Sequence, residues 1–178
     1  MDASIVLNDG DALERLYVES IHKKSQFTGF TLTNKSFRGI PLYIENWFIM
    51  APKRSVIMKA WLQEFERAIQ TGFHAYKQEI LHEGVHVESI YRSKDDVYLT
   101  MHACLQTILQ KRMTHIPPML LKPAENDMFR LLKVCEGQPL SCVMKNMRDH
   151  SEEVRSIPYI KLTKDMRDTK IDIRTYFL

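Results

Sequence analysis

An apolar stripe between Ser55 and Gly72 constrains the fold of this chain more than any other segment. Ser55 suits the N-cap position of a helix, and Gly72 stands where a helix should end. Between them the apolar residues recur at helical spacing: Ile57, Met58, Trp61, Leu62, Phe65, Ala68 and Ile69. So broad a stripe predicts a helix packed on a core. We expect its larger side chains to point into that core: Trp61, Leu62, Phe65 and Ile69.

Composition and charge narrow the class of protein. Of the 178 residues 44% are hydrophobic and 26% are charged, a mixture typical of a globular domain. The net charge is only +3, whereas a nucleic-acid-binding domain usually carries a strongly basic surface, so we expect no nucleic-acid partner. We also expect no membrane span, because no apolar run approaches about 20 residues. Since the first residues do not form a secretory signal, we expect a cytoplasmic location.

Three cysteines bear on the redox environment. Cys104, Cys135 and Cys142 are too few and too scattered for a disulfide framework or for a zinc site of the CxxC type. Their odd number favours a reducing compartment.

The remaining segments predict a mixed α/β unit with more helix than strand. Apolar runs and β-propensity predict strands or extended segments at 3–7, 27–33, 85–91 and 157–162. Helical spacing and capping residues predict helices at 11–21, 73–81, 93–111, 126–134 and 139–147. The last of the extended segments is followed by a charged tail, which we expect to be exposed.

His82-Glu83-Gly84-Val85-His86 matches the HExxH pattern of zinc peptidases, in which Glu83 would be the general base. Gly84 inside the supposed helix, and Arg92 where the extended pattern needs a histidine, both disfavour this interpretation. The alternative is a pair of histidines that flank a turn. We expect that His82 and His86 do not bind zinc together.

Two further groups of polar residues are candidates for a site. Asp2 begins an apolar strand, where a carboxylate could meet a ligand through a divalent cation, or could simply lie in solvent. Asp95, Tyr98 and His102 fall at i, i+3 and i+7 of the helix predicted from Ser93, so they would share a face. The alternatives are that Asp96 caps this helix and that His102 is a core histidine.

Several segments taken in order resemble the capsular polysaccharide synthesis type of glycosyltransferase, which is related to mannosyltransferases with a DXD sugar-nucleotide motif. The matching segments are 1–7, 45–53, the Trp61 helix, 96–102 and 157–162. The resemblance runs from residue 2 to about residue 163. It implies transfer of a sugar from a nucleotide-diphosphate donor to a glycan acceptor in polysaccharide synthesis.

The resemblance also implies roles for individual residues. Asp2 and Ser4 match the family's acidic motif and would bind the donor diphosphate, Asp2 through a divalent metal, Mn or Mg. Lys161 would approach the donor phosphates. The acceptor would contact a group that comprises Glu45, Asn46, Trp47 and Tyr98. Asp96 and His102 would orient or deprotonate the acceptor hydroxyl.

The implied fold is a truncated, helix-rich member of the GT-A class of nucleotide-diphospho-sugar transferases, with a mixed sheet and several packed helices. Residues 1–163 would be the C-terminal portion of that domain, and residues 164–178 an exposed charged tail. The family's nucleotide-binding half would precede residue 1. The chain would then be a fragment of such an enzyme, a split partner whose missing half a second chain supplies, or a non-catalytic interaction module or remnant.

Overall fold

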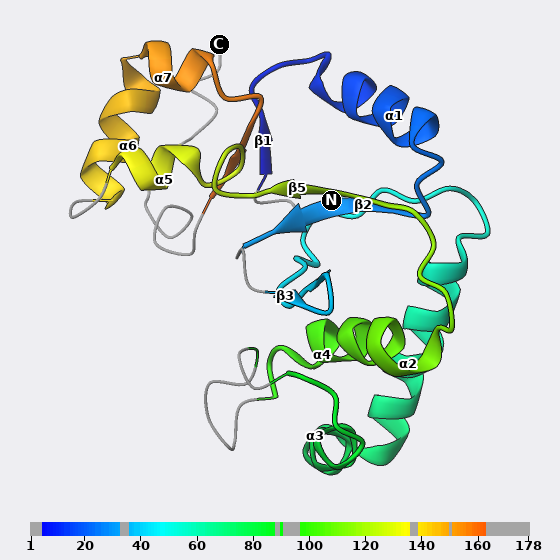
Figure 1. Cartoon of the computed structure of the whole chain (residues 1–178). Coiled ribbons are helices and arrows are strands. Elements are labelled where there is room, and N and C mark those ends of the chain that lie inside the picture. Colours follow the sequence, from blue (N-terminus) through cyan, green and yellow to red (C-terminus); the bar gives the residue numbers. More distant parts are fainter. Residues whose placement is uncertain are drawn as a thin grey trace. The chain divides into compact units, whose positions relative to one another are not determined.

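The structure is a computed structural model that describes residues 5–32, 36–87, 90, 97–135, 139–149 and 151–162. These residues form a helix-rich mixed α/β protein, as the sequence predicted. The chain divides into two compact units (Figure 1). We call Ser20–Lys122 the central unit, and Met1–Glu19 with Pro123–Leu178 the terminal unit. Within the described ranges, no helix is both long and apolar enough to cross a membrane.

The central unit combines short paired strands with three main helices. Its strands are β2 (Phe27–Thr31), β3 (Ser36–Phe37), β4 (Ile40–Pro41) and β5 (Met119–Pro123). Its helices are α2 (Val56–Thr71), α3 (Phe73–His82) and α4 (Thr100–Thr107), and α4 continues as a π-helical turn, Ile108–Arg112. β2 pairs with β5, and β3 pairs with β4.

The two ends of the central unit are hydrogen-bonded to each other. The backbone N–H of Gln26 donates to the carbonyl of Pro118 at 2.8 Å. The backbone N–H of Leu120 donates to the hydroxyl of Ser25 at 3.0 Å. The chain therefore enters and leaves this unit at neighbouring positions.

α2 forms where the apolar stripe predicted it. The Ser55 hydroxyl accepts a hydrogen bond from the backbone N–H of Met58 at 3.2 Å, which is the N-cap bond. The same hydroxyl donates to the carbonyl of Gln26 at 2.6 Å, which fixes the start of α2 against the start of β2. Gly72 ends the helix with φ of 85°, a conformation that favours glycine.

The buried face of α2 is narrower than predicted. Ile57, Trp61 and Ala68 are buried, but Leu62 and Ile69 are 58% and 56% exposed, so their predicted place in the core is wrong. Each lies one position beyond a buried residue, about 100° further round the helix. The stripe is wide enough that only part of it can face the core.

Glu64 lies on the buried face of α2. Its carboxylate accepts hydrogen bonds from the Tyr76 hydroxyl at 2.9 Å and from the Arg67 guanidinium at 2.8 Å. The Tyr76 hydroxyl also contacts the hydroxyl of Thr107 at 3.2 Å. Since the charge is paired and hydrogen-bonded, a carboxylate can be buried between α2, α3 and α4.

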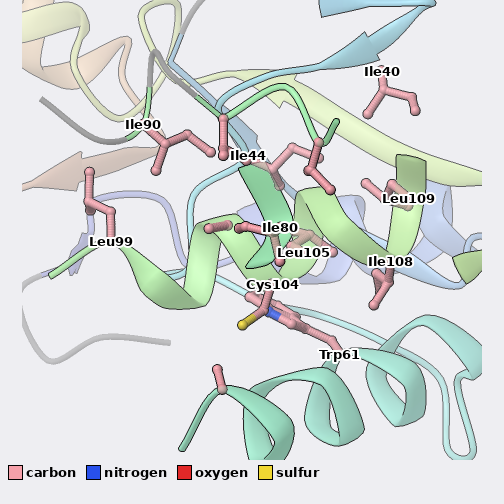
Figure 2. Close-up of a cluster of buried hydrophobic side chains, with 14 of the residues drawn as sticks. Ile40, Ile44, Trp61, Ile80, Ile90, Leu99, Cys104, Leu105, Ile108 and Leu109 are labelled. Carbon is pink, nitrogen blue, oxygen red and sulfur yellow. The ribbon is translucent and has the colours of Figure 1, made fainter. Parts of the chain in front are cut away.

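Trp61 belongs to the core of the central unit, where Figure 2 shows it beside Cys104. The side chain is 2% exposed and points from α2 toward Cys104 on α4. Its ring contacts Phe27 edge-on, with the centroids 6.0 Å apart. Its indole N–H donates to the carbonyl of Met101 at 2.8 Å. One side chain thus connects α2, β2 and the first turn of α4.

Two other expectations for the central unit need correction, and one strand was not predicted. The helix predicted to begin at Ser93 begins instead at Thr100, because residues 97–99 form a turn. The strand predicted at 85–91 is not formed at 85–87, which are irregular. β5 was not predicted, because its apolar run is short and directly follows two prolines.

The terminal unit is assembled from both ends of the described chain. Its elements are β1 (Ile5–Leu7), α1 (Ala12–His22, as far as Glu19), α5 (Arg130–Val134), α6 (Pro139–Arg148), α7 (Glu152–Arg155) and β6 (Tyr159–Lys161). β1 and β6 are antiparallel, and Ile5 faces Lys161. The Asn8 side chain donates to the carbonyls of Val154 and Ile157 at 2.6 and 2.9 Å. The predicted elements at 3–7, 11–21, 139–147 and 157–162 are confirmed in their described parts.

The cysteines differ from the expectation of scattered thiols. Cys135 and Cys142 form a disulfide that links the end of α5 to α6. Cys104 is a free thiol buried in the central unit, and burial raises its pKa to about 12.

We expect Trp61→Ala to lower the free energy of unfolding by roughly 3–5 kcal/mol, because it removes a buried aromatic ring and the bond to Met101. Denaturant titration measures the change. Leu62→Ala, one residue away on the exposed side of α2, is the matched control and should change stability by about 0.5 kcal/mol or less. Equal losses for both variants would contradict this placement of the core.

We expect the native, unreduced protein to show no thiol that reacts rapidly with an alkylating reagent at about pH 8, because the buried Cys104 stays protonated. In denaturant one thiol should become reactive, and after reduction three should. Mass spectrometry of the alkylated chain counts them. Three reactive thiols in denaturant without a reductant would show that Cys135 and Cys142 are not joined.

Candidate functional site

A cavity of about 320 Å³ lies in the central unit, between the segment 43–47, the α2–α3 corner and the segment 97–102. Its lining includes five residues that the sequence analysis placed in a site: Glu45, Asn46, Trp47, Tyr98 and His102. The resemblance assigned four of them to acceptor binding and His102 to catalysis. The structure thus brings together two predicted groups that are far apart in the sequence. We call this cavity the pocket.

Backbone bonds to β2 position the first wall of the pocket. The N–H of Glu45 donates to the carbonyl of Phe30 at 2.8 Å, and the N–H of Leu32 donates to the carbonyl of Tyr43 at 3.2 Å. The Trp47 ring stacks on the Phe30 ring with centroids 5.5 Å apart. The segment 43–47 therefore follows β2 closely and holds its side chains at fixed places.

A glycine in β2 permits this close approach. A Cβ at Gly29 would lie 2.8 Å from Cε1 of the Phe27 ring and 3.2 Å from the carbonyl oxygen of Phe48. Both distances are shorter than ordinary van der Waals contact. Glycine is the residue that leaves room for the backbone behind the pocket.

The first turn of α4 forms the second wall. The Thr100 hydroxyl donates to the carbonyl of Val97 at 2.6 Å and so holds the turn before the helix. The Trp61 indole holds the carbonyl of Met101. Between the walls, the Asn46 amide donates to the sulfur of Met101 at 3.7 Å, although these residues are 55 positions apart.

His102 and Glu45 form a buried polar pair at the pocket. Each residue is 5% exposed. Nε2 of His102 lies 3.6 Å from Oε2 of Glu45, too far for a good hydrogen bond. Among the described residues neither ring nitrogen of His102 has a hydrogen-bond partner. Buried polar atoms are nearly always satisfied, so a donor or acceptor from a bound molecule would be stabilised here.

Aromatic rings surround this pair. Tyr43 lies 5.2 Å from the His102 ring, centroid to centroid. Phe65 and Phe73 stack on each other at 6.1 Å and line the pocket with Trp47. An apolar lining with a few polar groups is typical of sites for small molecules, and flat rings suit the apolar face of a sugar.

Three of these aromatic residues were not predicted from the sequence to lie in a site. Tyr43 stands beside the predicted segment 45–47, and Phe73 begins α3. Phe65 was assigned to the core stripe and is in fact half-buried. Their aromatic side chains, close in sequence to the predicted site, could have indicated a role in it. Hydrophobic periodicity, however, assigns such residues to the core.

Tyr98 lines the pocket from the turn before α4, not from a helical face as predicted. It precedes α4 and is 91% exposed, so it does not share a helical face with His102. Lys161 lies in β6 of the terminal unit, where its side chain is buried. Asp2, Ser4 and Asp96 lie outside the described residues, as do Asp95 and the tail 164–178. Their predicted roles stay predictions.

The HExxH pattern is not displayed on one helix. α3 ends at His82, and Gly84 has φ of 72°. The Glu83 carboxylate accepts from Arg112 at 2.6 Å, and the His86 ring stacks on Phe37 at 3.7 Å. Within the described ranges no three His, Cys, Asp or Glu side chains are grouped so that they could hold a metal.

Comparison of the chain with protein-family models, with curated proteins and with solved structures found no match. What the protein does is therefore inferred from its pocket and from the sequence resemblance.

We expect Gly29→Ala to lower the free energy of unfolding by about 1–3 kcal/mol, because the added methyl group must displace the Phe27 ring or the Phe48 carbonyl. Gly10→Ala is the control, since a Cβ there meets nothing within 4 Å. Thermal and denaturant unfolding of both variants measure the difference. A neutral Gly29→Ala change would mean that the Phe27 ring and the Phe48 carbonyl do not lie this close to Gly29.

Proposed function

We propose that this chain belongs to a glycosyltransferase and that the pocket binds the acceptor sugar. One observation supports this most: residues from two distant segments, which the resemblance assigned to acceptor binding and catalysis, line one cavity around a buried pair. A chance resemblance would give no reason for these residues to meet.

The polar pair suits activation of a hydroxyl group. An acceptor hydroxyl that donates to a ring nitrogen of His102 would pass its proton to that nitrogen as its oxygen attacks the anomeric carbon of the donor sugar. The new C–O bond forms while the bond from the sugar to the diphosphate breaks, and the diphosphate leaves with the electron pair. The carboxylate of Glu45, 3.6 Å away, would stabilise the imidazolium that results.

The aromatic lining suits orientation of the sugar ring. Trp47 is held by Phe30 and Phe65 is held by Phe73, so both rings are in place before a ligand arrives. Such preorganisation reduces the entropy that binding costs. The acceptor would be held between ring faces with one hydroxyl directed at His102.

The donor side of the proposal depends on the resemblance. Asp2 and Ser4 would hold the diphosphate, Asp2 with Mn or Mg, and Lys161 would add positive charge. A GT-A-like fold, and a partner chain that supplies the nucleotide-binding half, belong to the same proposal. A divalent metal would neutralise the leaving diphosphate.

The test begins with binding. We expect the chain to bind at least one glycan on an array, with Glu45→Gln and His102→Ala each weakening binding by about tenfold or more, because the first removes a buried negative charge and the second a buried hydrogen-bonding group. Calorimetric titration measures the affinity. His115→Ala and Glu66→Gln, exposed residues outside the pocket, are matched controls and should leave it unchanged.

Transfer is then measured as release of nucleoside diphosphate from a panel of UDP- and GDP-hexoses in the presence of that glycan. His102→Ala should abolish release while the melting temperature stays close to that of the wild type. Glycan binding without release from any donor would mean that this chain does not transfer sugar by itself, as expected of a split enzyme that lacks its partner chain or of a non-catalytic interaction module. An unchanged glycan affinity in both Glu45→Gln and His102→Ala would refute the proposed acceptor site.

A further inference from the structure

The carboxylate of Glu45 gives the pocket a negative charge. Glu45 is 5% exposed and is the single carboxylate among the described residues that line the pocket. No lysine or arginine occurs among those residues. His102, whose Nε2 lies 3.6 Å from Oε2 of Glu45, is charged only when it is protonated. Because burial of a carboxylate is costly without a positive charge beside it, the pocket favours a ligand that supplies one.

The aromatic lining favours the same kind of ligand. Five of the described residues that line the pocket carry Phe, Tyr or Trp rings: Tyr43, Trp47, Phe65, Phe73 and Tyr98. The face of such a ring carries negative partial charge, so it attracts an ammonium group as well as the apolar face of a sugar. The carboxylate and the rings are separate features of the lining, and both of them stabilise a cation.

The spacing of Glu45 and His102 indicates where the positive charge lies on the ligand. The ring nitrogens of His102 have no hydrogen-bond partner among the described residues, so one of them can accept from a sugar hydroxyl. Substituents on adjacent, staggered ring carbons stand about 3 Å apart, close to the 3.6 Å between Nε2 of His102 and Oε2 of Glu45. The substituent next to that hydroxyl is therefore brought to the carboxylate. An ammonium there forms a charge-assisted hydrogen bond, whereas a hydroxyl leaves the negative charge uncompensated.

We propose that the acceptor is an amino sugar with a free, protonated amine on the ring carbon next to the accepting hydroxyl. The hydroxyl contacts His102, the ammonium contacts Glu45, and the aromatic rings enclose both. This inference rests on the proposed function, because it uses the same pocket and the same hydroxyl. It adds the substrate class, a hexosamine that is not N-acetylated, and makes Glu45 the residue that determines specificity.

The ammonium would also assist the transfer of the donor sugar. In that step the hydroxyl passes its proton to His102, its oxygen bonds to the anomeric carbon of the donor, and the diphosphate leaves with the electron pair. A positive charge on the next ring carbon stabilises the negative charge that develops on the attacking oxygen. Glu45 would hold that positive charge in place.

The experiment compares the methyl glycosides of glucosamine and galactosamine with their N-acetylated and 2-hydroxy counterparts. Each is titrated at about pH 7, where most of a free amine is protonated, into the 178-residue chain, and ligand-observed NMR measures the affinity. We expect the preferred amino sugar to bind at least about tenfold more tightly than its 2-hydroxy counterpart, because it pairs with a buried carboxylate. The N-acetylated sugar should lose at least the same factor, since acetylation removes the charge and adds bulk.

Two pocket variants locate the amine. Glu45→Gln keeps the size of the side chain and removes its charge, so the affinity ratio of the amino sugar to its 2-hydroxy counterpart should fall to about threefold or less. The melting temperature should stay close to that of the wild type. His102→Ala should weaken both sugars by a similar factor and preserve the ratio, because His102 contacts the hydroxyl. A ratio that survives Glu45→Gln, or that is lost in His102→Ala, overturns the inference.

Glu66→Gln is the matched control. Glu66 is exposed on α2 and does not line the pocket, and this variant removes the same charge as Glu45→Gln. It should retain the full preference for the amino sugar. Loss of the preference in Glu66→Gln would show a general attraction of the amine to the charge of the protein and would overturn the inference.

Other outcomes, all measured on the wild-type chain, separate this inference from the proposed function. Equal affinity for the amino sugar and its 2-hydroxy counterpart overturns the amino-sugar acceptor and leaves the pocket as a sugar site. Tighter binding of the N-acetylated sugar also overturns it, in favour of a neutral amide. Cyclohexylamine that binds as tightly as the amino sugar would show recognition of an amine without a sugar and would contradict both proposals. If none of the glycosides binds, both proposals fail.

Discussion

The hydrogen bond from the Trp61 indole to the carbonyl of Met101 joins the core of the central unit to its pocket. The same side chain fills the space between α2, β2 and α4, so core packing sets where the first turn of α4 begins. That turn carries Thr100, Met101 and His102, which form one wall of the pocket. The position of His102 is thus a consequence of how one aromatic ring is buried between α2, β2 and α4.

The opposite wall depends on backbone pairing. Glu45 is held through its own N–H to β2, and its side chain is left to face His102. Two independent constraints, a core side chain and a strand-like backbone contact, therefore bring a carboxylate and an imidazole to 3.6 Å. The surrounding fold, and not only an interaction between Glu45 and His102, therefore holds the two groups in position. Such support from the surrounding fold is what a binding site needs in order to keep its geometry before a ligand arrives.

Features that depend on neighbouring residues in the sequence, such as helix ends and apolar periodicity, could be predicted. α2 was predictable with both of its ends because Ser55, Gly72 and the apolar period agree. Hydrophobicity could not tell which half of a wide stripe faces the core, so Leu62 and Ile69 were misplaced. Glu64 could be recognised as buried only once Tyr76 and Arg67 were known to reach it. Acidic residues after Ser93 resembled a helix start, but the turn at 97–99 overrides that signal.

The site was predictable to a different extent. The resemblance assigned Glu45, Asn46, Trp47 and Tyr98 to the acceptor and His102 to catalysis, and all five line one cavity. The aromatic partners Tyr43 and Phe73 were not found, because their roles depend on contacts across the fold. The order of segments also could not indicate that Tyr98 precedes the helix instead of forming part of it.

The chain order of the two units has a consequence for how the protein folds. The central unit is continuous in sequence and its ends, at Ser25 and Leu120, are hydrogen-bonded. The β1–β6 pair of the terminal unit, in contrast, joins residues on either side of that whole insertion. Closing so long a loop costs conformational entropy, but a folded central unit with adjacent ends replaces the loop by a short connection. The central unit should therefore fold first, and the terminal unit should assemble on a chain whose two parts are already close together.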